Sequence, residues 1–153
     1  MVTTVPRGSG KSVGKPAGGG FDRPSRGQPV PSFRTAGDGD FVMSAGELAT
    51  AVQYALPVVV LVVNNGMFGT IRMHQERNFP GRVVGTDLVN PDFAAYAAAF
   101  GAHGEAVQRT EEVEGAFERA VASGRPAILE LRVDPEAISP RATISALRAQ
   151  AGA

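Results

Sequence analysis

Two short polar segments of this sequence carry side chains that can bind a hard cation beside a phosphate. The first is Gly37-Asp38-Gly39-Asp40, and the second, Asn64-Asn65-Gly66, follows an apolar run. Asp38 offers a carboxylate oxygen and Asn65 an amide oxygen, and oxygen ligands of this kind suit Mg²⁺. The glycines of the first segment allow a sharp turn and a close backbone approach to a phosphate. The two segments together predict a magnesium and diphosphate site.

The residues between these segments predict a helix followed by a buried strand. Ser44 and Glu47 have the spacing of a capping box, which predicts a helix from Ser44 to about Tyr54. Residues 57–63 are apolar and mostly β-branched, as in a strand that is covered on both faces. Such strands occur in parallel sheets, where ligands bind beyond the carboxyl ends.

Strand and helix patterns continue to alternate after the second segment. Asn90-Pro91-Asp92 reads as a helix cap, a first-position proline and a first-turn acid, and Gly101 ends that helix. Further expected elements are a strand near 105–108, a helix capped by Thr110 and ended by Gly124, a buried strand over 126–133 and a last helix over 141–150. This order predicts an α/β fold, an open, mostly parallel, doubly wound sheet with helices on both faces.

Residues 1–36 have a different composition from the rest of the chain. They hold seven Gly and five Pro, with six Lys or Arg against one acid, whereas the remainder holds nine Arg against fourteen acids. This composition predicts a disordered basic tail. Pro29 and Pro31 argue against a central strand before Gly37, so we expect the first strand-helix unit to be missing or damaged. The Gly, Pro, Arg and Ser bias also favours a truncated or frameshifted gene.

Length and composition limit the classes of protein that fit. The 153 residues suffice for one core-bearing domain, expected over 37–135 between the basic tail and a C-terminal tail of 136–153. The chain has no cysteine, which excludes disulfides and thiolate metal sites and is compatible with a cytoplasmic location. Its longest apolar run, Ala55–Val63, is far shorter than the roughly 20 residues that span a bilayer, so no membrane association is expected.

The two polar segments together resemble the signature of a known family. Gly-Asp-Gly, 24 further residues and then Asn-Asn is similar to the motif of the thiamine diphosphate enzymes. Residues 64–70 resemble the group that contains acetolactate synthase, benzoylformate decarboxylase and pyruvate oxidase. The resemblance covers about residues 36–135 and implies the C-terminal cofactor domain of a 2-oxo acid carboligase or decarboxylase, with thiamine diphosphate and Mg²⁺ as cofactors.

The resemblance also implies roles for individual residues. Asp38, Asn65 and the main-chain oxygen of Met67 would hold the metal. The cofactor-binding set would be Gly37, Asp38, Gly39, Asp40, Asn65, Met67, Phe68 and Gly69, with the amides of Gly39, Asp40, Phe68 and Gly69 facing the diphosphate. His74 stands where acetohydroxyacid synthases of the family carry a substrate-facing tryptophan, and an active-site role and a surface position are both open for it. His103 is expected to be structural, and no catalytic residue is assigned.

The resemblance implies a partner as well. In the family, a pyrimidine-binding domain supplies the glutamate that activates the cofactor, and it does so from the partner subunit. We therefore expect a homo- or hetero-oligomer, with this chain as a fragment of a longer enzyme or as the stand-alone subunit of a split one. A third reading is a non-enzymatic module whose basic arm binds an anionic surface, although nucleic acid is a weak candidate because the arm lacks aromatic residues.

Overall fold

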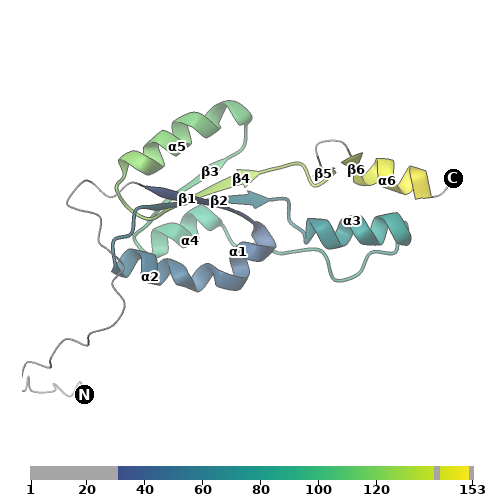
Figure 1. Ribbon diagram of the computed structural model, residues 1–153, viewed down its shortest axis with the longest axis horizontal. Coiled ribbons are helices and arrows are strands. Elements are labelled where there is room, and N and C mark those ends of the chain that lie inside the picture. Colours follow the sequence, from purple (N-terminus) through teal and green to yellow (C-terminus); the bar gives the residue numbers. More distant parts are fainter. Residues whose placement is uncertain (1–30, 140–141, 152–153) are drawn as a thin grey trace, which may run out of the picture.

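The computed structural model describes residues 31–139 and 142–151, and four parallel strands form its centre (Figure 1). The strands are β1 (Ser32–Gly37), β2 (Val58–Asn64), β3 (His103–Val107) and β4 (Ala127–Arg132). They lie in the order β1-β2-β4-β3, and every neighbouring pair is parallel. Their carboxyl ends therefore point to one edge of the sheet.

Helices cover both faces of this sheet, as the sequence predicted. One face carries α1 (Asp38–Ser44), the 3₁₀ turn η1 (Ala45–Glu47), α2 (Leu48–Gln53) and α4 (Phe93–Ala99), and the other carries α5 (Val113–Ala122) (Figure 1). Apolar side chains fill each interface. The first core contains Phe41, Leu48, Val62, Phe93, Ala97, Ala102 and Ile128, and the second contains Val59, Val107, Ala116, Ala120, Ala127 and Leu129. The fold is thus doubly wound.

A third group of elements lies beyond the carboxyl ends of the strands. It consists of α3 (Gly69–Asn78), the strands β5 (Ala137–Ser139) and β6 (Ala142–Thr143), and α6 (Ile144–Ala151) (Figure 1). The helix expected over 141–150 therefore forms, and it packs against α3. Within the described residues, no helix is both long enough and apolar enough to cross a membrane.

The prolines argued against a central strand before Gly37, and the strand found there lies at the edge of the described sheet. Residues 32–37 form β1, which pairs with β2 at the edge of the described sheet. Pro31 precedes the first ladder residue, Ser32, so it removes no hydrogen-bond donor from the ladder, and edge positions tolerate proline. The ordered body therefore begins before Gly37. The remainder of the expected basic tail, residues 1–30, lies outside the described residues.

The capping box expected at Ser44 and Glu47 is also absent. Ser44 is the last residue of α1, and its side chain makes no capping hydrogen bond. The helical run begins six residues earlier, at Asp38, with Gly37 as its N-cap. A capping box acts where a chain enters a helix, and here the chain is already helical because β1 ends directly at Gly37. The Gly-Asp-Gly segment is thus a helix N-terminus.

Two other helix starts are shifted from the predicted positions. Asp92, rather than Asn90, caps α4, because its carboxylate accepts from the Ala95 amide at 2.9 Å. The 3₁₀ turn before α5 has Arg109 as its N-cap, one residue before the expected cap, Thr110. The backbone amide of Arg109 donates to the Glu112 carboxylate at 3.3 Å. The expected ends are confirmed, since Gly101 and Gly124 adopt φ of 79° and 61° after their helices.

One glycine allows α4 to pack directly on β3. A Cβ atom on Gly104 would lie 2.2 Å from the carbonyl oxygen of Ala94, which belongs to the helix backbone. Neither backbone can yield by that amount, so only glycine fits this crossing. The close approach seats α4 against the sheet and thereby helps to position the preceding loop, which contains Asn90.

Candidate functional site

A pocket of about 300 Å³ opens where the carboxyl ends of β1 and β2 meet α1 and α3. All eight residues of the predicted cofactor set line it: Gly37, Asp38, Gly39, Asp40, Asn65, Met67, Phe68 and Gly69. Val63, Thr70, Ile71 and Ile138 complete the lining. Ile138 comes from β5, a segment that was expected to be a separate C-terminal tail. The fold thus brings together two segments that lie 27 positions apart in the chain.

Asp38 is a buried carboxylate without a cationic partner. Asp38 is 2% exposed. Its carboxylate accepts hydrogen bonds from the Gly39 amide at 3.0 Å, the Gly66 amide at 2.9 Å and the Asn90 side chain at 2.7 Å. Among the described residues no Arg, Lys or His forms an ion pair with it. Buried carboxylates are ordinarily paired with a cation, so this one suits a metal ion.

Residues of the loop from Asn65 to Gly69 line the same pocket, and the loop contains a main-chain carbonyl that has no partner in its bridge. Gly66 adopts φ of 70°, and Met67 forms an antiparallel bridge with Asp87. The hydrogen bonds of this bridge run from the Phe68 amide to Thr86 and from the Leu88 amide to Gly66, at 2.9 and 2.8 Å. The bridged residue Met67 therefore uses neither its amide nor its carbonyl in the pairing. Its carbonyl accepts no hydrogen bond from the described residues.

Asn65 is the third predicted ligand, and it lies against the start of α3. Its Oδ1 accepts from the Met67 amide at 3.2 Å, and its Nδ2 lies 2.8 Å from where a Cβ on Gly69 would stand. Glycine at position 69 therefore lets the Asn65 side chain lie over the helix end. The donor set is one carboxylate, one amide oxygen and one carbonyl. This set differs from a cluster of acids. Within the described ranges, no group of three or more His, Cys, Asp or Glu residues is arranged to hold a metal ion.

Two of the four amides expected to face a diphosphate have partners within the protein. The Phe68 amide donates to the Thr86 carbonyl, and the Gly39 amide donates to the Asp38 carboxylate. The first-turn amides of α3, beginning at Gly69 and Thr70, lie at the pocket and have no partner within the helix. They are better placed for an anion than Phe68 is.

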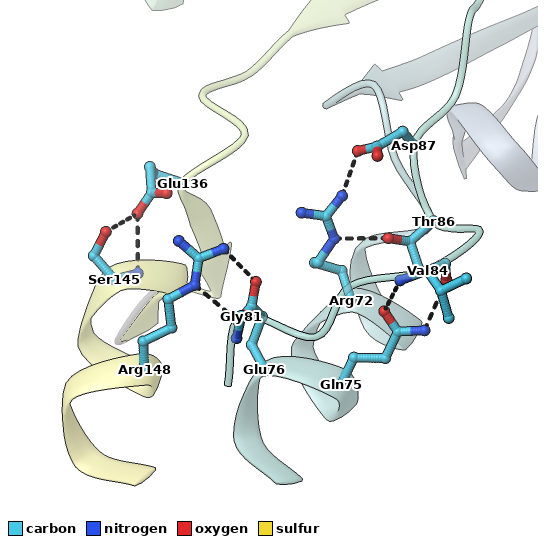
Figure 2. A network of polar contacts seen from close by, with 10 residues as sticks. All are labelled: Arg72, Gln75, Glu76, Gly81, Val84, Thr86, Asp87, Glu136, Ser145 and Arg148. Carbon is cyan, nitrogen blue, oxygen red and sulfur yellow. Dashed lines mark hydrogen bonds and ion pairs between the residues drawn. The ribbon is translucent and has the colours of Figure 1, made fainter. Parts of the chain in front are cut away.

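A network of polar contacts fixes α3 and the segment after it (Figure 2). Arg72 contacts Asp87 and donates to the Thr86 hydroxyl at 2.7 Å, and Gln75 exchanges two hydrogen bonds with Val84. These contacts hold residues 84–87 against α3, and the same segment forms the bridge with Met67. The position of the Met67 carbonyl is therefore determined by side chains of α3.

Comparisons with known proteins identify the family. Residues 12–131 match the family profile described as "Thiamine pyrophosphate enzyme, C-terminal TPP binding domain". The chain belongs to the thiamine pyrophosphate enzyme family. Its matching segment corresponds to the C-terminal cofactor-binding domain of that family.

The relatives of this thiamine pyrophosphate-binding domain are much longer proteins. It is 36% identical over 100 residues to the acetolactate synthase isozyme 2 large subunit of Escherichia coli, covering 65% of this chain and 18% of that protein. It is 36% identical over 98 residues to the mitochondrial acetolactate synthase catalytic subunit of Saccharomyces cerevisiae, covering 64% and 14%. Among solved structures, a benzoylformate decarboxylase from Polynucleobacter necessarius matches with a TM-score of 0.65 and 26% identity, covering 71% of this chain and 20% of that one. The chain thus spans about a fifth or less of these proteins.

Three side chains that hydrogen bonds link to Asp38 had no such role assigned from the sequence of this thiamine pyrophosphate-binding domain. Asn90 was interpreted as a helix cap, but its amide donates to Asp38 and, at 3.0 Å, to Asn64. Asn64 in turn donates to the buried carboxylate of Glu130 at 2.8 Å. The sequence held one signal for the role of Asn90. Asn90 and Asp92 can both cap a helix, but a helix needs only one N-cap, so the other side chain is free for a different contact.

The two histidines do not join the pocket of this domain. His74 is an exposed residue on α3 and does not line the pocket. His103 lies on β3, with its Nε2 3.5 Å from the Glu105 carboxylate, which also pairs with Arg119. Hydrogen bonding from Arg119 lowers the pKa of Glu105. The Glu105–Arg119 pair joins β3 to α5, and the structural role expected for His103 stays a prediction.

Proposed function

We propose that this domain binds the diphosphate group of thiamine diphosphate through a magnesium ion. Asp38, the Asn65 side-chain oxygen and the Met67 carbonyl would hold the ion. The observation that carries the proposal is the buried, cation-free carboxylate of Asp38, in one pocket with Asn65 and Met67. Such a donor set suits Mg²⁺, which takes few protein ligands and completes its shell with phosphate oxygens and water.

The electrostatics of the pocket lining favour a bound cation between protein and diphosphate. None of the lining residues is Lys or Arg, while Asp38 and Asp40 are acids. A diphosphate would meet net repulsion there unless a metal ion offset it. The amides in the first turn of α3 add a favourable field for an anion, since a helix N-terminus carries partial positive charge.

We propose further that the domain serves a 2-oxo acid carboligase or decarboxylase, as the resemblance to acetolactate synthases and a benzoylformate decarboxylase suggests. When bound, the cofactor supplies a thiazolium carbon that can add to the carbonyl group of a 2-oxo acid. The residues of this chain bind and orient the diphosphate end. A pyrimidine-binding domain, on the same polypeptide or on a second subunit, would hold the other end and provide the activating glutamate. No observation among the described residues favours the alternative of a basic-armed binding module.

Substitution of the ligand side chains tests the site. We expect Asp38→Ala and Asn65→Ala each to abolish magnesium-dependent binding of thiamine diphosphate, because each removes one oxygen ligand. Isothermal titration calorimetry with and without Mg²⁺ measures this, and circular dichroism checks the fold. Asn78→Ala, at the end of α3 and outside the pocket, is a matched control that should bind as the parent does. Parent-like binding by both ligand variants would show that the assignment is wrong.

A further inference from the structure

A line of hydrogen bonds joins the candidate metal ligand Asp38 to a second buried carboxylate. Asn90 donates from Nδ2 to Asp38 Oδ2 at 2.7 Å and to Asn64 Oδ1 at 3.0 Å. Asn64 donates from Nδ2 to Glu130 Oε1 at 2.8 Å. Glu130 is 1% exposed and belongs to β4, whereas Asn64 ends β2 and Asn90 lies before α4. We call Glu130, Asn64 and Asn90 the amide relay.

The direction of every bond in the amide relay follows from the carboxylate of Glu130. Oε1 of Glu130 accepts from Arg132 Nε at 3.0 Å as well as from Asn64. Because an ionised carboxylate only accepts, Asn64 must turn its NH₂ group toward Glu130 and its oxygen away. That oxygen then meets the Gly66 amide at 3.0 Å and the Asn90 side chain.

The same reasoning fixes the orientation of Asn90 and then of Asp38. Asn90 faces two acceptors, Asn64 Oδ1 and Asp38 Oδ2, so it must present both hydrogens of its NH₂ group. Asp38 Oδ2 receives this bond and one from the Gly66 amide, whereas Oδ1 receives one, from Gly39. Oδ1 is therefore the oxygen with more remaining capacity for a metal ion.

We propose that Glu130 is a positioning residue which, through Asn64 and Asn90, holds Asp38 as a cation ligand through one oxygen. This inference rests on the proposed role of Asp38 in binding magnesium. A purely structural role explains the burial of Glu130 poorly, because its Oε2 is buried and has no hydrogen-bond partner among the described residues. Burial of a charged group with an unsatisfied atom lowers stability, whereas an apolar side chain would pack there without that cost. Groups that orient a metal ligand commonly change metal affinity 10- to 100-fold when they are replaced.

The test compares Glu130→Leu, Glu130→Gln and Asn90→Leu in the full chain. The apparent affinity for Mg²⁺ is measured by calorimetry at a fixed concentration of thiamine diphosphate, and cofactor affinity is measured again at saturating Mg²⁺. We expect Glu130→Leu and Asn90→Leu to weaken Mg²⁺ binding about tenfold, and saturating Mg²⁺ to restore cofactor binding. Glu130→Gln should stay within about twofold of the parent, because its amide oxygen can accept the same two hydrogen bonds.

Asp92→Ala is the matched control for a loss of stability alone. It removes the cap of α4, two residues from Asn90, without touching the amide relay, so its Mg²⁺ affinity should equal that of the parent. If Glu130→Leu fails to fold, Asn90→Leu decides the result, with its melting temperature compared with that of Asp92→Ala. Parent-like Mg²⁺ affinity in the foldable leucine variants, or equal losses in Glu130→Gln and Glu130→Leu, would overturn the positioning role.

A failure of the metal site itself gives a different result. If Asp38→Ala retains the magnesium-dependent binding of the parent, the proposed function is wrong and the positioning role falls with it. If Asp38→Ala loses binding while the relay variants keep it, the metal site stands and only the positioning role is wrong.

Discussion

At the scale of single residues, Gly39 is where the first polar segment meets the ring of Phe68. A Cβ atom at this position would lie 2.5 Å from Cε1 and 2.7 Å from Cδ1 of the Phe68 ring, and 3.4 Å from Leu88 Cδ1. The ring of Phe68 thus covers the first turn of α1, and both residues line the pocket. Glycine is required here for close approach, although the backbone itself is helical.

We expect Gly39→Ala to displace the Phe68 ring and to weaken magnesium-dependent binding of thiamine diphosphate. The added methyl group should also lower the free energy of unfolding by about 1–3 kcal/mol, as overpacking commonly does. Urea denaturation and calorimetry measure the two effects. Gly46→Ala is the control, because a Cβ there meets no atom within 4 Å. Equal stability and binding in the two variants would contradict this account of Gly39.

At the scale of secondary-structure elements, the pocket depends on the packing of α6 against α3. Glu76 of α3 is 0% exposed, and Arg148 of α6 donates to both of its carboxylate oxygens (Figure 2). The Gly81 amide donates to the same carboxylate at 2.9 Å. These contacts attach α6 to α3, and the hairpin before α6 carries Ile138, which lines the pocket. The C-terminal segment thus contributes to the site.

We expect the attachment of α6 to weaken in acid. Hydrogen bonding from Arg148, with a smaller contribution from Gly81, lowers the pKa of Glu76 from 4.5 to about 2. Because the pKa is lower in the folded protein, the stabilisation is fully present above about pH 4.5 and is lost as the pH falls toward about 2. Hydrogen exchange of the α6 amides between pH 6 and 3 measures the effect.

Two variants separate the effect of the Glu76–Arg148 ion pair from the effect of acid on other carboxylates. Glu76→Gln should lower the free energy of unfolding at neutral pH by about 1–3 kcal/mol, because a buried charged hydrogen bond is lost. In this variant, the hydrogen exchange of the α6 amides should depend less on pH. Glu114→Gln removes an exposed acid of α5 and should leave both unchanged. If the pH dependence of α6 hydrogen exchange is unchanged in Glu76→Gln, another titrating group controls the attachment of α6.

At the scale of the whole molecule, the described residues form a pocket that we propose binds one end of the cofactor. The lining acids, Asp38 and Asp40, lie at the proposed metal and diphosphate position. Glu76 and Glu105 are engaged in contacts between elements, with Arg148 and Arg119 respectively. Neither of these two glutamates lines the pocket.

We therefore expect the chain alone to turn over neither pyruvate nor benzoylformate, even when it binds the cofactor. A coupled spectrophotometric assay with Mg²⁺ and thiamine diphosphate measures this. Addition of a separately produced pyrimidine-binding domain should restore turnover, and Asp38→Ala should abolish the restored activity. Turnover by the chain alone that Asp38→Ala removes would reveal a proton-transfer residue within this chain.

The sequence by itself determined the features that depend on local pattern and spacing. The apolar run of β2 predicted the sheet, because burial on both faces requires apolar residues in succession. The Gly-Asp-Gly segment and the double Asn carried the resemblance to the family. The glycines after α4 and α5 marked helix ends for the same reason, since few other residues adopt positive φ.

The tertiary structure decided how equivalent polar groups were distributed among competing partners. Ser44, Asn90 and Asp92 all carry side chains that can cap a helix, yet only Asp92 does so. Asn90 instead donates to Asp38, 52 positions away. The fold brings the loop before α4 close to the carboxyl end of β1. A local pattern shows what a side chain can bond to, whereas the choice among partners depends on contacts between residues that are distant in sequence.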